Sequence, residues 1–122
     1  MLQHELLRDR GILILKPNGA LRAEDFTALA AAVDPYIEQN GKLNGLMIEA
    51  PSFPGWEDFA ALLSHLRFVR DHHRQIRRIA VVSESPLLVA LPRIASHFIS
   101  AQVRTFAAND RAAALAWIEA DS

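Results

Sequence analysis

Two uninterrupted apolar runs constrain the fold of this chain more than any other feature. The segments KLNGLMIEA (42–50) and RRIAVVSE (77–84) are continuously apolar at their centres, with no alternation of apolar and polar residues. A strand that is apolar on both sides is covered on both faces, as in the middle of a parallel sheet between helices. The two runs therefore predict an α/β fold.

Helical patterns surround these runs. The segment 21–41 carries apolar residues at steps of three and four, which predicts a helix with one buried side: Phe26, Leu29, Ala30, Val33 and Ile37. Gly41 should end this helix, and Asp34-Pro35 should kink it or start a second short helix. A second stripe predicts another helix whose core side holds Phe59, Leu62, Leu63, Leu66 and Val69.

The two ends of the chain complete the pattern. Residues 4–16 predict a hairpin, because Gly11 supplies the positive φ that a tight turn needs. Ser85 and Pro86 open a third helix as cap and first residue, and Pro92 should bend it. We further expect a strand at 102–106 and a last helix over 109–120, capped by Asn109. The 122 residues fit one domain over 1–122.

Composition excludes several classes of protein. Lys+Arg 13 against Asp+Glu 14 leave no net field that would attract nucleic acid. No apolar run reaches the roughly 18 residues of a membrane helix, so we expect no integral membrane segment. Glu5, Arg8 and Asp9 interrupt the region where a signal peptide is apolar, and Cys 0 fits a reducing compartment. These features predict a cytoplasmic protein.

The chain resembles a known family. The order of elements, the pattern GW.DF..L after a strand, HHR.I.RIAVV and the closing RAAALAWI are together similar to the SpoIIAA-like family of small bacterial STAS/SEC14-type domains. The resemblance covers essentially the whole chain. It implies a mixed, mostly parallel sheet with an N-terminal hairpin, flanked by about four helices. Anti-sigma-factor antagonists, transporter STAS domains and SEC14 domains share this fold.

The resemblance also directs attention to the start of the second helix. In anti-sigma antagonists, a Ser at that point accepts a phosphate that switches partner binding, and the region corresponds here to Trp56, Glu57 and Asp58. No hydroxyl stands there, and Ser52 lies earlier in the loop without the family's Asp-Ser pair. Glu57 and Asp58 either imitate a phosphate weakly or favour the positive end of the helix.

Trp56 belongs to a loop that leaves the carboxyl end of a buried strand, where open α/β sheets bind ligands. Its ring either anchors the loop to the core or also contacts a ligand. The candidate ligand or partner loop comprises Glu49, Ser52, Phe53, Trp56, Glu57 and Asp58.

A second stripe of the same helix holds Ala61, His65, Phe68 and His72, roughly opposite the expected core side. It is interpreted either as an interface with another subunit or partner, or as ordinary exposed surface. No carboxylate or Cys completes a metal site around these histidines.

The segment RFVRDHHRQIRR (67–78) is the densest basic stretch. Arg70 and Arg74 are candidate anion contacts, although a solvated helix end gives the same pattern.

No catalytic motif is found, and no cofactor is expected. The sequence is interpreted as a non-enzymatic binding or regulatory module, as a homodimer or with a protein partner. The alternative is a carrier of a small apolar or lipid-like ligand beneath the apolar third helix. An enzyme would need a cleft with Glu49, Glu57 or a histidine of perturbed pKa.

Overall fold

The structure of the chain, a computed structural model, describes residues 2–52, 55–95 and 98–120. The five strands are β1 (Leu2–Leu7), β2 (Ile12–Pro17), β3 (Leu43–Glu49), β4 (Ile76–Val82) and β5 (Gln102–Phe106). The four helices are α1 (Ala23–Asn40), α2 (Phe59–His72), α3 (Pro86–Ala95) and α4 (Arg111–Glu119), and a short 3-10 turn, His73–Gln75, follows α2.

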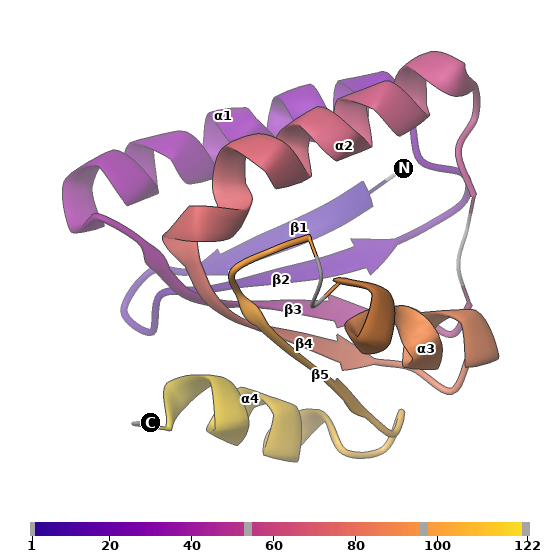
Figure 1. Cartoon of the computed structure of the whole chain (residues 1–122). Helices are drawn as coiled ribbons and strands as arrows, with labels where there is room; N and C mark the ends of the chain where they lie inside the picture. Colours follow the sequence, from indigo (N-terminus) through magenta and orange to yellow (C-terminus); the bar gives the residue numbers. More distant parts are fainter. Residues whose placement is uncertain (1, 53–54, 96–97, 121–122) are drawn as a thin grey trace.

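The strands form one sheet in the order β1-β2-β3-β4-β5. β1 pairs antiparallel with β2 through the N-terminal hairpin, and the remaining pairs are parallel. Figure 1 shows α1 and α2 above the sheet, α4 below it, and α3 beside the ends of the strands. The predicted mixed, mostly parallel α/β fold with four helices is confirmed.

The two apolar runs are buried for the reason the sequence suggests. Side chains alternate between the two faces of a strand. In β3, Leu46 belongs to the core under α1, whereas Met47 belongs to the core over α4, together with Ala80 and Val82 of β4. The inner strands thus contribute to two cores, and the buried polar exception in β4 is Arg78, which donates to the Ala120 carbonyl after α4.

Helix α1 runs unbroken through Pro35, so the expected second short helix does not form. Its buried residues include Phe26, Leu29, Val33 and Ile37, as the spacing predicts. Gly41 follows the helix with φ of 85°, and its N–H donates to the Ile37 carbonyl.

Helix α4 packs closely against the sheet at Gly45. A Cβ at this position would overlap the side chain of Ile118, so the close approach requires glycine in β3. The cap of α4 is Asp110 rather than Asn109, and the helix begins at Arg111. The predicted cap is wrong by one residue.

Helix α3 begins at Pro86, and the Ser85 carbonyl accepts the N–H of Val89 at 2.9 Å, as predicted for this start. Leu88 is buried in a small core with Ala50 and Val81. The side chain of Pro92 lies outside the described residues.

Candidate functional site

The loop before α2 is held to the loop before α1. Trp56 and Leu21 form an isolated parallel bridge, in which the Leu21 N–H donates to the Gly55 carbonyl and the Glu57 N–H donates to the Leu21 carbonyl, both at 2.8 Å. The indole Nε1–H of Trp56 donates to Nδ1 of His65 at 3.1 Å. Trp56 therefore fixes the loop to α2, and 38% of the residue remains exposed.

The acidic residues after Trp56 have local partners. Asp58 caps α2, because its Oδ1 accepts the Ala61 N–H at 2.9 Å. Glu57 forms an exposed ion pair with Arg22, with 2.9 Å between Oε2 and Nε. Both contacts stabilise the N-terminal end of α2, as the helix-start interpretation expects.

The predicted ligand loop does not converge on one point. Glu49 follows Met47 on the α4 side of β3, and its Oε1 accepts from Nε of Arg111 at 2.8 Å. Trp56 instead lies on the α2 side, beside His65. Ser52 is exposed, and Phe53 lies outside the described residues.

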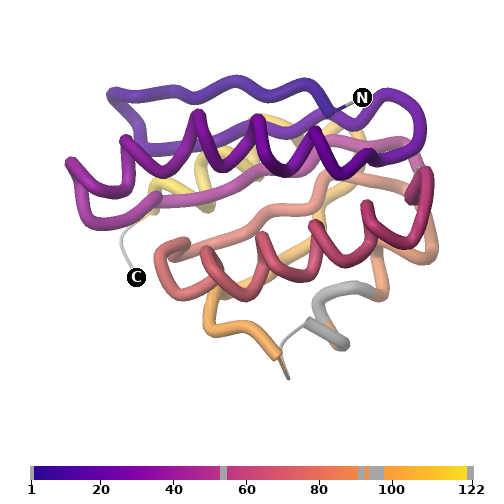
Figure 2. The backbone as a smooth tube through the Cα atoms, turned by 90° about the horizontal axis from the view of Figure 1, so that it is seen from above, coloured from indigo at the N-terminus to yellow at the C-terminus, as the bar shows by residue number. Residues whose placement is uncertain are grey.

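The face of α2 predicted to be outward is the inner one. Ala61 is fully buried, and only 7% of His72 is exposed. A cluster of aromatic rings connects α1 with α2. The ring centre of Phe26 lies 4.8 Å from that of His65 and 6.3 Å from that of Phe68. The ring centres of Phe68 and His72 are 4.1 Å apart. The placement of Ala61, His65, Phe68 and His72 opposite the core is wrong. Helix α1 covers this face within the same chain (Figure 2).

The two histidines of this inner face have different hydrogen-bond partners. His72 contacts two oxygen acceptors, the Phe68 carbonyl at 2.8 Å through Nδ1 and Asp34 Oδ1 at 2.6 Å through Nε2. Both ring nitrogens of this buried side chain therefore have a polar partner. His65 accepts the Trp56 N–H at Nδ1 and is neutral, and burial lowers the pKa of His65.

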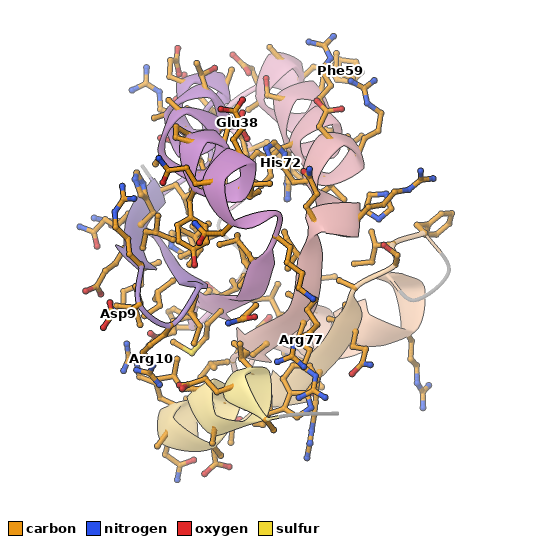
Figure 3. The ribbon with its side chains drawn as sticks, turned by 90° about the vertical axis from the view of Figure 1, so that its left-hand side faces the viewer. Asp9, Arg10, Glu38, Phe59, His72 and Arg77 are labelled. Carbon is orange, nitrogen blue, oxygen red and sulfur yellow. The ribbon has the colours of Figure 1, made fainter. Side chains whose placement is uncertain are left out.

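The opposite face of α2 carries the stripe that was predicted to be core. Phe59 is 67% exposed, Leu66 is 56% exposed and Leu63 is 38% exposed. Figure 3 shows Phe59 on the outer side of α2 and His72 between α2 and α1. We call Phe59, Leu63 and Leu66 the outer stripe.

One signal in the sequence could have identified this reversal. Arg70 follows Leu66 by four residues and therefore continues the outer stripe. An unpaired arginine does not sit in a core, so its place in the stripe favours solvent exposure. A histidine such as His72, by contrast, can be buried when both ring nitrogens have acceptors.

The basic stretch divides into two parts with different surroundings. Arg70 is exposed and bonds to the neighbouring Asp71 at 2.9 Å, and Arg74 is exposed. Arg77 and Arg78 both donate to carbonyls at the end of α4, and the Arg78 guanidinium lies 5.1 Å from the Trp117 ring centre. The latter two arginines hold α4 in place.

The rest of the described chain has a shallow surface depression but no metal cluster and no membrane-spanning helix. A shallow depression beside β1 and β2 is lined by Gln3, His4, Glu5, Ile14 and Lys16. Among the described residues, no three metal-ligating side chains gather. The helices of the described part are all too short or too polar to cross a membrane.

Comparisons with known proteins agree with this architecture. The sequence model of the SpoIIAA-like family matches residues 12–119. The chain is also similar to the crystal structure of an uncharacterised protein from the DUF3478 family with a SpoIIAA-like fold from Shewanella loihica PV-4, with 20% identity and a TM-score of 0.71. The alignment covers 97% of this chain and 92% of that chain. At this identity the likeness shows the fold alone. No curated protein matches the chain.

Proposed function

This chain belongs to the SpoIIAA-like family, and on that premise we propose that it is a non-enzymatic regulatory module of STAS-like type that acts through contact with another protein. The observation that carries the proposal is the outer stripe of α2. Phe59, Leu63 and Leu66 form a row of large apolar side chains that remain exposed in the described chain, Phe59 and Leu66 by more than half. Contiguous exposed apolar surface of this kind marks interaction sites.

The shape of the surface favours a protein over a small ligand. Small-molecule sites are concave and enclose most of their ligand. The outer stripe is a convex ridge along a helix, and such ridges pack into the grooves of other helices. Charged residues at both ends of α2, Glu57 and Arg70 among them, are exposed and supply the polar rim that protein interfaces carry.

The N-terminal end of α2 also fits a regulatory contact surface. Trp56 and Asp58 tie the loop to α2 by defined hydrogen bonds, so the end of the outer stripe is held in one geometry. A preorganised surface loses less conformational entropy when a partner binds. The negative charges of Glu57 and Asp58 stay in place without a phosphate, which supports a binding surface that is permanently in one state.

The experiment compares matched double variants by native mass spectrometry of gently purified protein. Phe59→Asp with Leu66→Asp places two charges on the outer stripe. The control, Leu87→Asp with Val89→Asp, places two charges on α3, where Leu87 is 59% exposed and Val89 is 46% exposed. We expect wild type and the α3 variant to retain an added protein mass that the α2 variant loses. Retention of that mass in both variants would contradict the proposal.

A carrier of a small apolar or lipid-like ligand is the second candidate. Leu87, Val89 and Phe98 expose large apolar side chains on and just after α3, a helix that also contributes Leu88 to the core. A lid over an apolar ligand would present such residues to the ligand. The same spectra test this function: a reproducible added mass of small-molecule size, lost in the α3 variant and kept in the α2 variant, would favour the carrier.

A further inference from the structure

We infer that the outer stripe of α2 takes a second copy of this chain, in a two-fold dimer whose α2 helices run antiparallel. The inference rests on the proposed function and names its partner. Two features of α2 carry it: the exposed apolar centre and the separation of charge along the helix.

Charge is segregated along α2. Glu57 and Asp58 lie at its N-terminal end, where Arg22 pairs with Glu57 and also with Glu24, so carboxylates outnumber arginines there. Arg67 and Arg70 lie in its C-terminal part and Arg74 in the 3-10 turn, and against them stands the carboxylate of Asp71, so the C-terminal end stays net positive. No Asp, Glu, Lys or Arg lies in the segment 59–66 between these ends. A surface with an acidic end, an apolar centre and a basic end is complementary to itself only when the second copy runs in the opposite direction.

The spacing of the residues sets the register. With the two-fold axis at Leu63, that residue meets its own copy, and Phe59 lies opposite the segment 66–67 of the second copy. Arg70 then lies opposite Trp56 and Glu57. From Phe59 to Arg70 the helix rises about 16 Å, at about 1.5 Å per residue, so all these contacts fit within one antiparallel helix pair.

The basic end meets chemistry that suits an arginine. In this register, the Arg70 guanidinium can donate to the Glu57 carboxylate of the second copy. The two-fold axis produces this contact twice.

The available area indicates a weak dimer. A stable interface of standard size buries roughly 800 Å² of each partner. Three side chains of α2 and the flanking arginines are fewer than the roughly 20–30 residues that such an interface takes from each partner, so the dimer should dissociate on dilution. We therefore expect self-association that depends on protein concentration.

A charge-swap experiment tests both the partner and the direction of the helices. Sedimentation velocity is measured over a concentration series for wild type, for Arg70→Glu, for Glu57→Lys and for an equimolar mixture of the two variants. Each variant alone places two like-charge pairs at the ends of its dimer. In the mixed dimer, the new carboxylate at 70 meets the new ammonium at 57, and the native Glu57 meets the native Arg70.

We expect wild type to dimerise and each variant alone to have a dissociation constant at least roughly fivefold higher. The mixture should recover the wild-type dissociation constant. Circular dichroism checks that both variants fold, as substitutions at exposed residues should allow. A wild type that stays monomeric up to about millimolar protein would overturn the inference. Dimers that the mixture fails to restore would overturn the antiparallel arrangement.

The outcome also separates this inference from the function on which it rests. A monomeric wild type that still carries another protein's mass, lost with Phe59→Asp and Leu66→Asp, would replace the second copy by that partner and keep the interaction module. A wild type with neither a dimer nor an added protein mass would overturn both.

Discussion

The inner and outer faces of α2 have similar apolar content and opposite surroundings. The inner face buries Ala61 and His72 and stacks His65 against Phe26 of α1. The outer face exposes Phe59 and Leu66. Hydrophobicity alone does not decide which face of a helix is buried. What decides it here is the neighbouring helix, which offers the inner face an aromatic ring and a carboxylate.

The comparison predicts a large difference between two phenylalanines. Phe68→Ala should lower the free energy of unfolding by about 3 kcal/mol, because it removes a ring that packs in the core. Phe59→Ala should change it by no more than about 0.5 kcal/mol, because this ring is 67% exposed. Urea denaturation of dilute protein measures both. Equal losses would mean that the two faces are not distinct.

Two aspartates, Asp34 at the inner face of α2 and Asp71 at its exposed side, sharpen the same contrast. Asp34→Ala should cost about 2 kcal/mol, because it leaves Nε2 of the buried His72 without its acceptor. The control is Asp71→Ala, which removes the exposed partner of Arg70 and should leave stability unchanged within measurement error. A loss of stability in the control as large as that of Asp34→Ala would contradict the assignment of inner and outer partners.

The inner face should also respond to pH through His65. Burial lowers the pKa of His65 below its ordinary value of 6.5, so between the two values the unfolded chain binds more protons than the folded one. The unfolding free energy should therefore fall as pH drops below about 6.5 and level off above it. His65→Phe should reduce this slope. If the slope between pH 5 and pH 8 is the same in wild type and variant, His65 is not the neutral acceptor of the Trp56 N–H.

Much of the fold follows from local patterns in the sequence. Continuous apolar runs predict β3 and β4, because strands covered on both faces carry apolar residues on both sides at their centres. Gly11 and Pro86 predict the hairpin and the start of α3 through backbone geometry. Pro35 does not break α1, which shows that helix packing outweighs the local cost of one proline.

The candidate site is less predictable because it depends on distant contacts. His72 is buried by virtue of Asp34, which lies 38 positions away in the sequence. Glu49 bonds to Arg111 on the α4 side of the sheet, whereas Trp56 lies on the other side. Strand alternation gives Glu49 this side, but its partner can be identified only once the position of α4 is known. The anchoring role of Trp56 was among the predicted alternatives, and its acceptor, His65, is visible only in the structure.

The most direct test of the two-faced character of α2 uses the absence of native cysteine. Ala61→Cys and Leu66→Cys introduce one thiol on each face, at positions that are 0% and 56% exposed. The labelling rate with a thiol reagent is measured on dilute, folded protein and on the same variants unfolded in urea. We expect Leu66→Cys to react at nearly its unfolded rate and Ala61→Cys to react at least a hundredfold more slowly, through opening of the α1–α2 contact. Fast labelling of Ala61→Cys together with protection of Leu66→Cys would contradict the assignment of the two faces and remove the basis for a binding surface on the outer stripe.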